Sequence, residues 1–136
     1  MSFLFINTNE IIERFPDTAN SLLVDCYLND QPHCSSRIFR LYSHLPKHHH
    51  SSCDETLFLL KGKAEFYIGD EERKDIEPGE MVTFFKNTVH GVKSLSDEPV
   101  VFLAFDTPRR SPDDVHFVNA DETKGVKFVS HIDKNI

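Results

Sequence analysis

The chain has 136 residues, of which 39% are hydrophobic and 27% charged, which is the composition of an ordinary globular domain. Its formal net charge of −7 argues against a nucleic-acid or anionic-membrane partner, because neither surface would attract it. No segment approaches the ~20 apolar residues that cross a bilayer, and residues 1–7 lack the basic and apolar runs of a signal peptide.

The predicted elements begin with a short helix over residues 10–15, capped by Thr8 or Asn9 and ended by Pro16. Short apolar segments bounded by turn residues then recur about every ten positions. These predicted strands are residues 21–28, 37–42, 56–60, 64–68, 81–85, 90–92 and 100–105. Such a series predicts an all-β sandwich or barrel.

One connection can be assigned from its turn residues. Residues 56–60 and 64–68 are joined by only three residues around Gly62, which predicts a hairpin with a positive φ at this glycine. Residues 71–77 are polar and are expected to be exposed, with a charged face at 70–75.

The tail differs in composition from the strands before it. Residues 107–114 contain two prolines and four charged residues, which excludes a central strand. Residues 115–118 and 125–132 are predicted to add edge strands. Arg109 and Arg110 could bind an anion, but we interpret them as a solvated pair of charges.

Three cysteines, Cys26, Cys34 and Cys53, are irregularly spaced, and none forms a CxxC pair. This pattern does not indicate a disulfide framework, and we therefore expect a reducing, cytoplasmic compartment. Cys53 lies among the candidate site residues, where an inert thiol is expected more than a redox-active one.

A run of histidines supplies the candidate site. On a strand, His48 and His50 point to one face and His49 to the other. Glu55 follows after a short turn, and His90 lies on a later predicted strand. Imidazoles and a carboxylate on one face are ligands for a divalent metal. The alternative is that the histidine run is a solvated surface loop, as we also expect for His44.

The spacing of these residues resembles the first motif of the cupin superfamily, in which His48-x-His50 is followed after four residues by Glu55 and after six more by Gly62. The second cupin motif resembles the segment that opens at Gly79 and closes at His90. Three positions differ from the usual pattern. Phe85 stands where proline is usual, and Tyr42 and Asn87 stand where glycine is usual. Apart from glycine, asparagine is the residue that best tolerates the left-handed backbone conformation.

The resemblance implies a double-stranded β-helix, or jelly-roll barrel, of two facing sheets with a short N-terminal helix. It implies one domain over residues 1–136, with a barrel core at about 37–105, an N-terminal extension at 1–36 and a tail at 106–136. Inside the barrel, one divalent transition metal (Fe, Mn, Ni, Co or Zn) would be held by His48, His50, Glu55 and His90. Phe39, Phe84 and Phe102 are expected in the core, lining an apolar cavity.

Two functions remain open at this point. The first is a metal-dependent enzyme, such as a dioxygenase or isomerase, acting on a small molecule at the metal. The second is a non-enzymatic module that binds a metal or small ligand, because one scaffold hosts both kinds. No general base or nucleophile is visible besides the candidate ligands, so no catalytic residue is assigned. A metal-free structural protein would require His90 to lie away from the other three residues.

The assembly prediction depends on sheet edges, which an open barrel must cover or pair. Residues 21–28 are apolar without alternation, which indicates burial on both faces. We therefore expect a homodimer with this segment or residues 37–41 at its interface. The alternative is a monomer in which the N-terminal segment covers its own edge.

Overall fold

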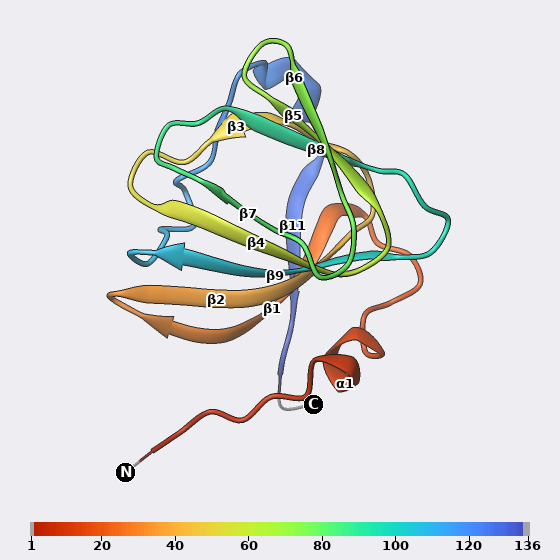
Figure 1. Cartoon of the computed structure of the whole chain (residues 1–136), viewed down its shortest axis with the longest axis vertical. Helices are drawn as coiled ribbons and strands as arrows, with labels where there is room; N and C mark the ends of the chain where they lie inside the picture. Colours follow the sequence, from red (N-terminus) through yellow and green to blue (C-terminus); the bar gives the residue numbers. More distant parts are fainter. Residues whose placement is uncertain (1, 135–136) are drawn as a thin grey trace.

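The computed structural model describes residues 2–134 as two facing β-sheets with a short helix beside the larger one (Figure 1). The six-stranded sheet has the order β11-β1-β2-β9-β4-β7, and the five-stranded sheet has the order β10-β3-β8-β5-β6. The elements are α1 (Thr8–Ile12), β1 (Ser21–Gln31), β2 (Cys34–Leu41), β3 (Leu45–His49), β4 (Asp54–Lys61), β5 (Ala64–Ile68), β6 (Glu72–Ile76), β7 (Met81–Phe84), β8 (His90–Ser94), β9 (Val100–Thr107), β10 (His116–Phe117), the 3-10 helix η1 (Ala120–Thr123) and β11 (Lys127–Ile132). The predicted all-β fold is confirmed. Within residues 2–134, no helix is long and apolar enough to cross a membrane.

The main core lies between the two sheets and is built by alternation along each strand. On β4, Leu57 and Leu59 are buried in this core, whereas Thr56 and Phe58 alternate with them and point to the outer side. Phe39, Phe84 and Phe102 are buried in the same core, as expected, but only Phe39 of the three lines the cavity beside the histidines. A second apolar cluster covers the outer side of the large sheet, where Ile11 and Phe15 from the region of α1 pack on strand residues including Val24, Ile38 and Val101.

The helix begins two residues earlier than predicted, at Thr8, and it ends at Ile12 and not at residue 15. Asn7, not Thr8 or Asn9, is the N-cap, and its side-chain oxygen accepts hydrogen bonds from the backbone N–H groups of Asn9 and Glu10 at 3.0 and 3.3 Å. The first N–H groups of a helix have no partner within the helix, and the side-chain oxygen of Asn7 accepts from two of them. The helix therefore starts directly after Asn7.

The predicted hairpin between residues 56–60 and 64–68 is wrong. β4 already has β7 and β9 as neighbours, so the chain at Gly62 crosses from the large sheet to the small one. β5 instead pairs with β8 and β6, and the polar residues 71–77, expected only to be exposed, contain β6. Gly62 does have the predicted positive φ, at 84°.

Gly62→Ala is expected to lower the free energy of unfolding by about 3 kcal/mol, because strain at positive φ adds to a clash. An added Cβ would lie 2.6 Å from the carbonyl oxygen of Pro99 and 2.9 Å from Cγ2 of Val100. Gly79→Ala is the control, because Gly79 has a φ of 92° but open space around it, so it should cost only about 1 kcal/mol. Urea unfolding measures both, and equal losses would contradict a role for the clash.

The sheets extend beyond the expected barrel core of residues 37–105. β1, from the expected extension, and β11, from the tail, both join the large sheet and pair in parallel. β10 and β11 are edge strands, as predicted for the tail. β1 lies between β11 and β2, and β2 lies between β1 and β9, so neither strand offers the open edge that the dimer prediction assumed.

Candidate metal centre

Alternation on β3 sorts the histidine run into two groups. His48 pairs with His90 across β3 and β8, and the rings of His48, His50 and His90 face one another in the barrel, with all three side chains buried. His49 lies on the opposite side, where its ring stacks on His116 at a centroid distance of 5.0 Å. The predicted orientation of His48 and His50 against His49 is confirmed, and the structure brings His90 to them.

The three imidazoles present one nitrogen each to a common point. One ring nitrogen of His48, His50 and His90 lies within 4.8 Å of the other two. Each Nδ1 lies near a backbone carbonyl: His48 and Pro46 at 2.8 Å, His50 and Asp114 at 2.7 Å, and His90 and Thr88 at 2.9 Å. A carbonyl only accepts hydrogen bonds, so Nδ1 carries the proton and Nε2 keeps a lone pair for a metal. The donor set therefore fits a transition metal.

Glu55 adds a carboxylate from the opposite sheet. Its Oε1 lies 3.1 Å from Nε2 of His90 and 3.5 Å from Nε2 of His50, while Oε2 accepts a hydrogen bond of 3.2 Å from Arg37. Glu55 thus contacts the histidine group through one oxygen and is held by the other. Nε2 of His50 is buried and has no hydrogen-bond partner among residues 2–134, as expected of an atom that awaits a ligand.

The buried histidines and Glu55 differ in how readily they carry charge. Burial and the neighbouring His90 lower the pKa of His48 to about 3, so this ring is neutral. Burial alone would lower the pKa of His50, but the Glu55 carboxylate raises it above the ordinary value. Burial opposes ionisation of Glu55, yet His50 and His90 hold its pKa well below the ordinary value. The carboxylate therefore attracts positive charge to the point where the nitrogens meet.

Arg37, which was not among the predicted site residues, is 4% exposed and lies at the centre of a buried charge cluster. Its guanidinium lies 3.2 Å from Glu55 and 3.7 Å from each of Asp25 and Asp106. These residues occupy inward positions on β1, β2, β9 and β4, in line with core side chains such as Phe39. The strand alternation that places Phe39 inward also places Arg37 inward, and that was the available signal.

The prediction that Arg109 and Arg110 form a solvated pair of charges is wrong for Arg110. Arg109 is exposed and forms an ion pair with Asp30, as a solvated charge would, but Arg110 is only 5% exposed. Arg110 lines the same cavity as the histidines, together with Phe39 and several aliphatic side chains. The cavity is small, with about 20 Å³ of space for water-sized groups. The loop after β9 therefore contributes to the site.

Asp114 fixes the loop that follows His50. Its carboxylate accepts hydrogen bonds from the backbone N–H groups of Ser51 and Ser52 at 2.8 and 3.0 Å, and from both hydroxyls. These bonds hold the pKa of Asp114 below its usual range despite burial. The residue was missed because nothing in the sequence links position 114 to the histidine run.

Cys53 is buried beside this loop, and burial raises the pKa of its thiol to about 12. The thiol is therefore protonated at neutral pH, in agreement with the expected inert role. Cys26, Cys34 and Cys53 are all free.

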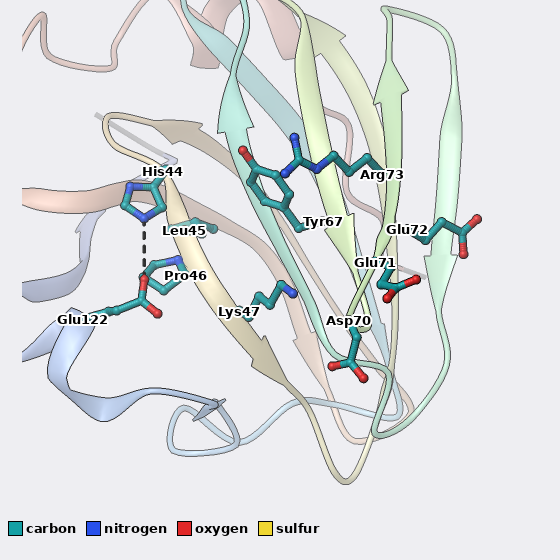
Figure 2. A pocket seen from close by; sticks show the side chains of 10 residues that line it. All are labelled: His44, Leu45, Pro46, Lys47, Tyr67, Asp70, Glu71, Glu72, Arg73 and Glu122. Carbon is teal, nitrogen blue, oxygen red and sulfur yellow. Dashed lines mark ion pairs between the residues drawn. The ribbon is translucent and has the colours of Figure 1, made fainter.

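A second hollow, of about 600 Å³, lies away from the histidines on the outer side of the small sheet (Figure 2). Its residues come from β3, the β5–β6 hairpin and η1, and they carry both signs of charge. His44 lies there, 4.0 Å from Glu122, which confirms it as a surface histidine. The hairpin residues Asp70 and Glu72 border the same hollow and agree with the expected charged face.

Comparison with known proteins supports this architecture. A family model described as "Cupin domain" matches residues 43–106. An uncharacterized protein of Aquifex aeolicus is 30% identical over 78 residues, which is 57% of this chain and just under two thirds (64%) of that protein.

Two solved structures show the same fold. A protein with a double-stranded β-helix domain from Klebsiella pneumoniae is 16% identical, with a TM-score of 0.64 over 72% of this chain and 82% of that one. The DMSP lyase DddQ from Ruegeria pomeroyi is 20% identical, with a TM-score of 0.54 over 65% of this chain and 44% of that one. The segment that the "Cupin domain" model matches, just under half of the chain, contains His48, His50, Glu55 and His90.

Proposed function

We propose that this protein holds one divalent transition metal at Nε2 of His48, His50 and His90, with Oε1 of Glu55 as an oxygen ligand. The observation that carries the proposal is the set of three Nδ1–carbonyl contacts, which leave the three buried Nε2 atoms to face one point. At that point Nε2 of His50 has no hydrogen-bond partner in the described part of the chain, and Nε2 of His90 lies 3.1 Å from Oε1 of Glu55. A set of nitrogen and oxygen donors without a thiolate suits Fe, Mn, Ni, Co or Zn.

The function that fits such a centre best is a metal-dependent enzyme acting on a small molecule inside the barrel, as a dioxygenase or isomerase would. The metal would supply Lewis-acid polarisation or a site for oxygen. The chain itself would orient Glu55 through Arg37 and exclude water with apolar walls such as Phe66. The lyase DddQ, of similar fold, supports an enzymatic role for this kind of barrel.

The second candidate is a metal- or ligand-binding module without catalysis. The side chains that line the cavity favour it, because they include no nucleophile or general base besides the four candidate ligands. Oxygen uptake and depletion of a metabolite panel, measured with protein loaded with each metal, would separate the two candidates.

Elemental analysis of protein purified without chelator or nickel resin tests the metal itself. We expect up to one equivalent of transition metal per chain, and one full equivalent after loading and dialysis. Protein that retains less than a tenth of an equivalent after loading would contradict the proposal.

Metal affinity is expected to fall as the pH drops, because protons compete for the ligand nitrogens. Glu55 raises the pKa of His50 above the ordinary value of ~6.5, so the loss should begin near neutral pH. His48, with a pKa of about 3, should contribute only at much lower pH. Competition with a chromogenic chelator between pH 5 and pH 8 measures this, and equal affinity at both ends would contradict histidine ligation.

We also propose a homodimer, formed through the outer side of the large sheet and the N-terminal segment. Phe3 and Phe5 are exposed, and the segment extends away from the barrel (Figure 1). Met81 and Phe105 are exposed on the outer side of the large sheet, where a partner's segment could cover them. The free cysteines are compatible with a cytoplasmic protein.

Light scattering is expected to give twice the monomer mass of 15.7 kDa at micromolar concentration. Changing Phe3 and Phe5 together to serine should favour the monomer without unfolding it, because both side chains are exposed. A wild-type mass of 15.7 kDa that does not change on concentrating would reject the dimer.

A further inference from the structure

The space beside the three histidines is closed to solvent. Its free volume of about 20 Å³ holds little more than one water-sized group, and the side chains of His48, His50 and His90 are at most 5% exposed. A small molecule that acts at the metal therefore has neither room nor a route to it until part of the wall moves. Segments that open and close over a site solve this problem in many enzymes.

The wall beside His48 consists of two aromatic side chains from the tail. Phe117 on β10 lies opposite His48 in the strand register, and the two ring centroids are 5.6 Å apart. Phe128, at the start of β11, lines the cavity, and its ring centroid lies 6.4 Å from that of His48 and 5.6 Å from that of Phe117. Both phenylalanines are only half-buried, so a single layer of side chains separates the cavity from solvent here.

These two phenylalanines close the gap between the edges of the two sheets. β10 is the edge strand of the small sheet, and β11 is the edge strand of the large sheet. The chain passes from one edge to the other through residues 118–126, which contain η1 (Figure 1). The ring contact between Phe117 and Phe128 spans the gap on its inner side.

Residues 115–128, here called the tail flap, are held less firmly than the strands they cover. None of these residues is buried, and β10 pairs with β3 at only two residues. Glu122 of η1 lies 4.0 Å from His44, but both side chains are exposed, and such ion pairs contribute little (Figure 2). Segments with few buried apolar contacts open at a small cost in free energy.

The chain is fixed to the body of the protein on both sides of the tail flap. Before it, the carboxylate of Asp114 accepts the hydrogen bonds from Ser51 and Ser52. After it, the carbonyl oxygen of Asp133 accepts a hydrogen bond of 2.8 Å from Arg14. The tail flap can therefore swing outward between two fixed points while the rest of the large sheet stays in place.

We propose that the tail flap is a lid over the metal site, and that its outward movement takes Phe117 and Phe128 away from His48 and joins the cavity to solvent. The histidines remain in place when the flap opens, because β3 keeps its pairing with β8. This inference rests on the proposed function and deepens it by naming the element that controls access to that site.

A reversible disulfide between β10 and β3 tests the lid. His49 and His116 lie directly opposite each other in the antiparallel pair, where Cα atoms are about 5.5 Å apart or less, as a disulfide requires. Their rings stack on the outer side of β3, so the inward face keeps its residues when both become cysteine. The double variant His49→Cys with His116→Cys is loaded with zinc, oxidised with diamide to hold the flap closed, and reduced with a phosphine to release it.

Extraction of zinc by a chromogenic pyridylazo chelator should be at least about tenfold slower from the oxidised form than from the reduced form, and equal rates would overturn the lid. His49→Ser with His116→Ser is the matched control, because it loses the same two imidazoles and cannot form the disulfide. It should release zinc at the rate of the reduced form, with or without diamide. Global unfolding in urea is followed for both forms by circular dichroism. If oxidation slows unfolding and extraction by the same factor, zinc leaves by global unfolding and the lid is rejected.

Hydrogen exchange in the metal-free protein tests the lid without zinc. The backbone N–H of Val118 donates to the carbonyl oxygen of Lys47 at 3.0 Å when the flap is closed. It should exchange at least about 100-fold faster than the N–H groups of the central strand β9, and the disulfide should slow it at least about tenfold. Exchange at Val118 as slow as in β9 would overturn the lid. Protein that holds no zinc after loading would reject the metal site of the proposed function, and the exchange at Val118 then decides on the lid by itself.

Discussion

Alanine at His50 or at His90 is expected to lower metal affinity by at least about 100-fold, whereas alanine at His49 should leave it unchanged. Each of the first two changes removes a nitrogen that faces the common point, and even the residues behind such ligands are worth 10–100-fold in affinity. His49 faces the other side of β3 and stacks on His116. Elemental analysis and competition with a chelator of known affinity measure the effect on each variant.

The choice of His49 as control makes the experiment specific to strand register. His49 lies in β3, His50 directly follows β3, and His90 lies in β8. Each variant loses one imidazole, so a difference in metal affinity between them reports the direction of the side chain and not the loss of a histidine as such. The variants must keep the wild-type circular dichroism spectrum, because His50 also anchors the loop at Asp114. If His49→Ala abolished binding and His48→Ala did not, the assignment of the inward face would be wrong.

The residues of the candidate site could be predicted because their signals are local. His48 and His50 share a face by strand alternation, and the resemblance to a known motif placed Glu55 and His90 with them. The identity of neighbouring strands could not be predicted in the same way. Residues 56–60 and 64–68 have the pattern of a hairpin, but the length of a turn does not determine which sheet the next strand joins.

The burial of charged side chains could not be predicted from the sequence either. Arg37 and Asp25 lie at inward positions, but charged residues are rarely buried, so composition predicts them outside. Arg110 was misjudged for the same reason, since Arg109 beside it does behave as a surface residue. Arg37 and Asp25 are stabilised by partners from distant strands, and a single sequence does not show such partners.

Arg37→Met is expected to lower the free energy of unfolding by about 3–5 kcal/mol, which is the usual cost of removing one partner from a buried ion pair. Methionine keeps much of the volume, so the loss would come from charge. Asp25, Glu55 and Asp106 would remain buried, and their repulsion would no longer be offset by the guanidinium. Urea unfolding at pH 7 measures the change.

Arg40→Met provides the control within the same strand. Arg40 lies on the outer side of β2, where it contacts the carbonyl oxygen of Asp17 and the ring of Tyr42. Arg40 is half-buried and contacts no carboxylate in the described residues, so its replacement by methionine should cost no more than about 1 kcal/mol. Similar losses for Arg37→Met and Arg40→Met would contradict a central role for the buried cluster.

The pH dependence of Arg37→Met distinguishes lost charge from lost packing. Without the guanidinium, the buried carboxylates should take up protons more readily in the folded variant than in its unfolded chain. A carboxyl group with a raised pKa in the folded state adds stability at low pH and loses it as the pH rises. The deficit of the variant relative to the wild type should therefore be smaller at pH 5 than at pH 8, and Arg37→Met with Asp106→Asn should recover part of it. A deficit that is the same at both pH values would mean that Arg37 acts by packing, not by charge.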